Sequence, residues 1–134
     1  MNRKTARENA FILLFEAVSK NDETFEEIFD KATTIRGLEC DEYVKTVFFG
    51  VYSDSRAIEE CISKCIVGWK QERLSVSSKA LLRLAIYEMM FMEDIPVKVS
   101  INEALELSKK YDDEKTYLFI NGALNAAAEL LGKK

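Results

Sequence analysis

Apolar residues recur at intervals of three and four along most of the chain, the spacing that places them on one face of a helix. The first such stretch predicts a helix over residues 3–19. Thr24 and Glu27 then have the spacing of a capping box and predict the start of a short second helix. An apolar period without proline predicts one long third helix over residues 41–69, with a bend expected near Gly50.

The second half of the chain continues the helical pattern. Ser75 or Ser77 can cap a fourth helix that runs to about Phe91. This helix is apolar on almost all sides, which is typical of a central, buried helix. Ser100 and Glu103 have the spacing of a second capping box and predict the start of a fifth helix.

A sixth helix is expected to begin near Thr116, and only Val97–Val99 alternates like a strand, over too few residues to form one. We therefore expect an all-α fold of six to seven helices. The chain has 134 residues, which suits a single domain. Because the helix connections look short except near residues 68–76, we expect two packed three-helix bundles, an N-terminal one over 1–70 and a C-terminal one over 71–134.

Basic residues are concentrated at the N-terminus. The chain carries a net charge of −4, yet Arg3, Lys4 and Arg7 stand within its first seven residues with no acidic residue among them. Arg3 and Arg7 continue the stripe of Phe11 and Leu14, so they extend the core-facing side of the first helix past the edge of the core. Two interpretations stay open: a rim that binds an anionic partner, or ordinary solvated cations. On either interpretation we expect the three side chains to pack on nothing essential.

The composition excludes several chemistries. The chain has no histidine and only five glycines without a glycine-rich cluster, so histidine-based catalysis, histidine-ligated metals and phosphate-binding glycine loops are absent. Paired carboxylates are expected on solvated faces. Cys61 and Cys65 share a helical face, where packing is favoured over metal binding. We expect no catalytic residue, no metal and no cofactor, and a cytoplasmic protein without a membrane span.

Three residues of the predicted core helices need a structural explanation. Arg83 and Glu88 interrupt the apolar fourth helix, and buried charges need partners, so a structural ion pair or an interface contact is expected for them. Gly122 is expected to permit the close approach of two helices.

Several segments of the sequence resemble the NusB transcription antitermination family, and they run in that family's order and spacing. The segments are RKTARENA from Arg3, WKQERL from Trp69, ALLRLAIYE from Ala80, DIP from Asp94, VSINEA from Val99 and FINGAL from Phe119.

The resemblance implies a fold of two three-helix bundles and a binding function without catalysis. Members of the family bind the boxA element of nascent ribosomal RNA together with NusE, a small-subunit ribosomal protein, so that RNA polymerase reads through terminators. By residue, the resemblance implies RNA binding at the N-terminal cations and on the last helix, and partner binding on the fourth helix. The RNA-binding residues would be Arg3, Lys4, Arg7, Thr116 and Phe119, and the partner-binding residues Ser78, Lys79 and Arg83.

Departures from the family pattern leave a second hypothesis open. Thr5 stands where the basic run often continues, and Ser78 stands where an acidic residue is common. Phe119 is equally compatible with stacking on a base and with plain core packing. The alternative to an RNA-binding antitermination factor is a protein-interaction module, with a homodimer possible, that docks a ribosomal protein and binds little RNA itself.

Overall fold

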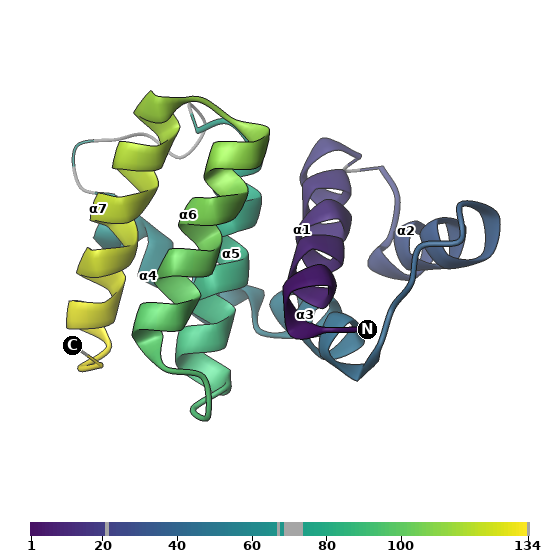
Figure 1. The fold of residues 1–134 in the computed structure, drawn as a ribbon, viewed down its shortest axis with the longest axis horizontal. Helices are drawn as coiled ribbons and strands as arrows, with labels where there is room; N and C mark the ends of the chain where they lie inside the picture. The colour runs from purple at the N-terminus through teal and green to yellow at the C-terminus, as the bar shows by residue number, and fades with distance from the viewer. Residues whose placement is uncertain (21, 67, 69–73, 134) are drawn as a thin grey trace.

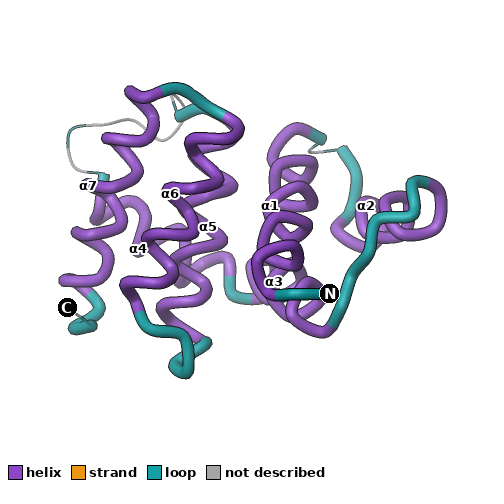
Figure 2. Tube along the Cα trace, viewed as in Figure 1, coloured by secondary structure: helices purple, strands orange, loops and turns teal. Residues whose placement is uncertain are grey.

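The structure, a computed structural model, describes residues 1–20, 22–66, 68 and 74–133. In these residues the chain forms helices and loops but no β-strand, as Figure 2 shows, which confirms the expected all-α class. A short π-helical segment, Lys31–Ile35, continues the second helix. The α-helices are α1 (Arg3–Ser19), α2 (Phe25–Asp30), α3 (Glu42–Ser53), α4 (Ser55–Cys65), α5 (Val76–Phe91), α6 (Val97–Tyr111) and α7 (Glu114–Leu130).

Polar side chains cap α2 and α5 at the helix starts that the sequence predicted. Thr24 and Glu27 form the predicted capping box of α2, in which each side chain bonds the other residue's backbone N–H. Ser75, rather than Ser77, is the N-cap of α5, and its hydroxyl accepts a hydrogen bond from the backbone N–H of Ser78. These caps satisfy backbone donors that the first turn of a helix leaves without partners.

The prediction of one long third helix is wrong. The segment is divided into α3 and α4 at Asp54, whose backbone (φ −106°, ψ 24°) departs from helical geometry. The apolar period continues across this one-residue break, so the hydrophobic pattern gives no sign of it. The predicted end of the helix at Trp69, like most of the Trp69–Leu74 motif, lies outside the described residues.

The predicted start of the fifth helix is also wrong. Helix α6 begins at Val97, directly after Pro96, and Ser100 lies inside it with its side chain turned into the protein. Proline is well suited to a helix start because its ring fixes φ near the helical value. Helix α7 begins at Glu114, two residues before Thr116, with Asp113 as its N-cap.

The helices lie in two groups (Figure 1), α1–α3 on one side and α4–α7 on the other, with α5 packed against both. The expected boundary near residue 70 placed α4 with the first group, whereas α4 packs on α5 and α7. Helix α1 packs on α3 and on α5, which joins the groups. Helix α5 is buried along most of its length, as its apolar sequence predicted. No helix in the described part of the chain is long and apolar enough to cross a membrane.

Candidate functional site

The three N-terminal cations lie in different environments, although they are neighbours in sequence. Arg3 and Lys4 are exposed, whereas Arg7 is only 4% exposed. Phe11 and Leu14, one and two turns further along the same stripe of α1, are buried in the core. The expectation that all three cations pack on nothing essential is therefore wrong for Arg7. On this stripe of α1, burial already begins at Arg7, one turn before Phe11.

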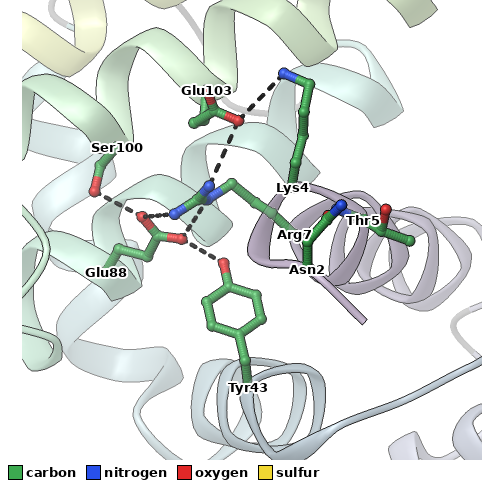
Figure 3. Close-up of polar contacts among 8 residues, drawn as sticks. All are labelled: Asn2, Lys4, Thr5, Arg7, Tyr43, Glu88, Ser100 and Glu103. Atoms are coloured by element: carbon green, nitrogen blue, oxygen red, sulfur yellow. Dashed lines mark hydrogen bonds and ion pairs between the residues drawn. The ribbon is translucent and has the colours of Figure 1, made fainter.

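Arg7 forms an ion pair with Glu88 of α5, whose side chain is 1% exposed. Its Nε lies 2.8 Å from Glu88 Oε2 and its Nη2 lies 3.4 Å from Oε1. Figure 3 shows that two hydroxyls complete the shell of this carboxylate: Ser100 donates to Oε1 over 2.7 Å, and Tyr43 donates to Oε2. The structural pair expected for Glu88 is thus present, and its partner is Arg7.

The charges of this cluster, which we call the Arg7 network (Arg7, Tyr43, Glu88, Ser100 and Glu103), stabilise one another. Burial alone would lower the pKa of Arg7, but the hydrogen bond to Glu88 and the nearby carboxylates raise that pKa above its usual value. Burial, followed by the Glu88 charge, raises the pKa of Tyr43. Tyr43 is therefore a neutral donor and Arg7 a permanent cation, the protonation states that the Glu88 carboxylate requires.

Lys4 and Arg7 share a second carboxylate, that of Glu103 on α6. Glu103 Oε1 lies 3.6 Å from Lys4 Nζ and 3.5 Å from Arg7 Nη1. These residues, with Glu8 and Lys110, line a depression of about 200 Å³ between α1 and α6. Acidic and basic groups therefore alternate over this surface instead of forming a uniform basic patch.

Glu8 joins α1 to the end of α6. Lys110 Nζ lies 2.6 Å from Glu8 Oε2, and the Tyr111 hydroxyl donates to the same oxygen. The hydrogen bonds from Lys110 and Tyr111 hold the pKa of Glu8 below its ordinary value. This contact connects the second turn of α1 to the end of α6.

Arg3 has no acidic partner among the described residues. Its guanidinium instead lies over the ring of Tyr43, with Cζ 4.4 Å from the ring centroid. The stacking orients the guanidinium at the protein surface and leaves its N–H donors to solvent. Arg3 is thus the cation of the three whose charge is least compensated by the protein.

The predicted residues of the last helix lie apart from these cations. Helix α7 begins at the top of the view in Figure 1, whereas α1 begins at the bottom. Thr116 is half-buried, and its backbone N–H donates to the Asp113 side chain over 2.8 Å. Phe119 is half-buried and packs against the core, as its helical period allows. The structure therefore does not bring Thr116 and Phe119 together with Arg3 and Lys4.

The predicted partner-binding residues share α5, but one of them is inaccessible. Ser78 is 3% exposed, and its hydroxyl accepts a hydrogen bond from Ser75 over 2.9 Å. Lys79 and Arg83 are half-buried. Arg83 Nε donates to Glu59 of α4 over 2.6 Å, so the partner expected for this charge is present. Of the three, Lys79 and Arg83 have partly exposed side chains that a docking protein could contact.

Cys61 and Cys65 both lie on α4, where Cys61 is buried and Cys65 is partly buried against the core. Cys61 and Cys65 have their Sγ atoms 3.9 Å apart, and burial, with Cys65 nearby, raises the pKa of Cys61 to about 12. A buried thiol of this kind packs as a small apolar side chain. Within the described residues no group of three or more acidic, histidine or cysteine side chains is arranged to hold a metal ion.

Sequence relatives agree on one family. The family model described as "NusB family" matches residues 4–129. The transcription antitermination protein NusB of Clostridium botulinum is 43% identical over 129 residues, which cover 93% of this chain and 96% of that protein. The protein of the same name from Bacillus subtilis is 40% identical over 128 residues, 93% of each chain.

Solved structures agree as well. NusB of T. maritima superimposes with a TM-score of 0.84 at 32% identity, over 96% of this chain and 92% of that one. A structure described as antitermination factors NusB and NusE in complex with dsRNA gives a TM-score of 0.83 at 27% identity, over 96% of both chains. The curated relatives are named for transcription antitermination, and none of these names describes a catalytic activity. The chain belongs to the NusB family of transcription antitermination proteins.

Proposed function

We propose that the protein is an RNA-binding antitermination factor that acts with the ribosomal protein NusE on a boxA element of nascent ribosomal RNA. The observation that carries the proposal is the similarity, over 96% of both chains, to a NusB chain that is described in complex with NusE and dsRNA. The site of action would be the cytoplasmic antitermination complex of RNA polymerase.

Arg3 and Lys4 are the first candidates for phosphate contacts, because both are exposed cations at the start of α1. Arg7 has a different role in this proposal. Its charge is already compensated by Glu88 and Glu103, so it positions the start of α1 and leaves the phosphates to its neighbours. Thr116 and Phe119 would contact RNA further along the same strand, at the start of α7.

Two phosphate contacts are too few for tight binding by the protein alone, so the ribosomal protein should supply much of the affinity. We expect NusE to dock on the α4–α5 side, where Lys79 and Arg83 reach the surface. RNA and NusE would then use different helices of the protein.

Gel filtration tests the proposal. The protein is run alone, with NusE, and with NusE plus a boxA-like RNA, and an RNA of the same composition in scrambled order is the control. The proposal predicts co-elution of all three components with the boxA-like RNA and a weaker association with the scrambled RNA. Absence of RNA from the complex under all conditions would contradict the proposal.

A second candidate function is favoured by one observation, the ion pairing of Lys4 and Arg7 with protein carboxylates. Cations that are compensated in this way attract RNA weakly, as expected for a module that docks a ribosomal protein and binds little RNA. In that case the protein and NusE co-elute, and the boxA-like RNA neither joins nor strengthens the complex. A homodimer would elute early without any partner.

A further inference from the structure

The ion pairs around the N-terminal cations form a balanced group. Arg7 and Lys4 carry two positive charges, and Glu88 and Glu103 carry two negative ones within 4 Å of them. Figure 3 shows Glu103 between Lys4 and Arg7, on the opposite side of the guanidinium from Tyr43. The first turns of α1 are therefore less electropositive than their sequence suggests.

The two carboxylates of this group differ in accessibility. The Glu88 side chain is 1% exposed and accepts hydrogen bonds from Tyr43 and Ser100, so it is fixed in the Arg7 network. The Glu103 side chain is 25% exposed, and the Lys4 side chain that it faces is 72% exposed. The contact between Glu103 and Lys4 is therefore open to solvent, and an approaching phosphate can reach both groups.

An exposed ion pair of this kind is weak, because water and salt screen it and both side chains lose freedom when they pair. When a phosphate displaces Glu103 from Lys4, the protein therefore loses only a small amount of free energy from the broken ion pair. The same phosphate must then lie close to the released carboxylate, which repels it. Glu103 thus opposes any RNA that is held through Lys4, whatever the sequence of that RNA.

We propose that Glu103 is an internal counter-ion of Lys4 that RNA phosphate displaces, and that it lowers the affinity of the N-terminal cations for RNA. This inference rests on the proposed function, since it assigns a repelling charge to the same surface. Its consequence is that contacts to Lys4 alone do not hold RNA, and the penalty is the same for every RNA sequence. RNA held only by phosphate contacts binds poorly, whereas RNA that is also held by NusE and by base contacts overcomes the repulsion.

The test measures RNA affinity by fluorescence anisotropy, in low salt and with NusE present, for the parent protein and for Glu103→Gln. BoxA-like and scrambled RNAs are both used. We expect Glu103→Gln to bind both RNAs about three- to tenfold more tightly, because one repulsive charge is lost and Lys4 is released. Addition of salt should reduce this gain.

Glu106→Gln is the matched control, because it makes the same charge change one helical turn away in the same depression. Glu106 is exposed and has no ion pair among the described residues. General removal of negative charge would strengthen binding equally in both variants. Our proposal predicts that Glu106→Gln changes the affinity less than about twofold.

Lys4→Ala provides the second control through a double-mutant cycle. If Glu103 acts through Lys4, the gain from Glu103→Gln falls below about twofold in the Lys4→Ala background. A gain that is independent of Lys4, an equal gain in Glu106→Gln, or a loss of affinity in Glu103→Gln would each overturn the inference while leaving RNA binding by the parent intact. Absence of RNA binding in every variant would instead overturn the proposed function, and the inference with it.

Discussion

The guanidinium of Arg7 and the carboxylate of Glu88 form a buried ion pair between the second turn of α1 and the last turn of α5, 81 residues further along the chain. Helix α5 belongs to the C-terminal group of helices, so this pair ties the two groups together. It also fixes the direction in which α1 presents Arg3 and Lys4 to solvent. A residue that looks like part of a basic binding surface is thus a structural link.

Arg7→Ala is expected to destabilise the protein by about 3–5 kcal/mol, since it leaves the Glu88 carboxylate buried without its cation. The free energy of unfolding in urea measures this loss. Arg3→Ala is the matched control one turn earlier, and because it removes only an exposed contact with the Tyr43 ring, it should alter stability by no more than about 1 kcal/mol.

The double variant Arg7→Met with Glu88→Gln separates loss of the pair from exposure of an unpaired charge. It removes both charges and keeps a side-chain oxygen that can accept from Tyr43 and Ser100. We expect it to be more stable than Arg7→Ala alone. Equal stability of Arg7→Ala and Arg3→Ala would show that the pair contributes nothing to the fold.

Two glycines should respond to alanine in opposite ways. A Cβ at Gly50 of α3 would clash with the ring of Tyr87 on α5, so Gly50→Ala should destabilise the fold by about 1–3 kcal/mol. A Cβ at Gly122 of α7 would meet nothing within 4 Å, so Gly122→Ala should stabilise its helix by about 0.5–1 kcal/mol. Thermal unfolding checks both predictions: the midpoint temperature should fall for Gly50→Ala and rise for Gly122→Ala.

Acid should weaken the connection between Glu8 and the end of α6. Because Lys110 and Tyr111 lower the pKa of Glu8 in the folded state, this residue contributes stability above its unfolded pKa of about 4.5 and loses it as the pH falls through the lower folded pKa. Glu8→Gln should therefore be less stable than the parent at pH 6, and the difference should shrink as the pH falls below 4.5. A constant difference at every pH would contradict this assignment.

The helices and the central place of α5 were predictable from the sequence, because apolar spacing and capping residues are local signals. The break at Asp54 was not, since the apolar period runs through it. Gly122 gave a misleading signal. It was expected to permit close helix packing, yet the space beside it is open, whereas Gly50 is the glycine that a neighbouring ring requires.

The candidate site was predictable only in part. The stripe from Arg3 through Arg7 to Phe11 was visible, as was the isolated Glu88 in an apolar helix. The pairing of Arg7 with Glu88 was not, because their separation along the chain carries no local signal. The contributions of Tyr43 and Ser100 carry no local signal either, and the spacing of Ser100 and Glu103 indicates a helix cap that the structure does not contain.

The most direct test of the account is the salt dependence of RNA binding by the NusE-bound protein, compared between the parent and the double variant Arg3→Ala, Lys4→Ala. If each cation neutralises one phosphate of single-stranded RNA, the slope of log K against log salt should be shallower in the variant by about 1.4. Binding of NusE should stay unchanged, and the free energy of unfolding should fall by no more than about 2 kcal/mol, because only two exposed contacts are lost. Equal slopes and equal RNA affinities in the parent and the variant would contradict the claim that these two cations bind RNA.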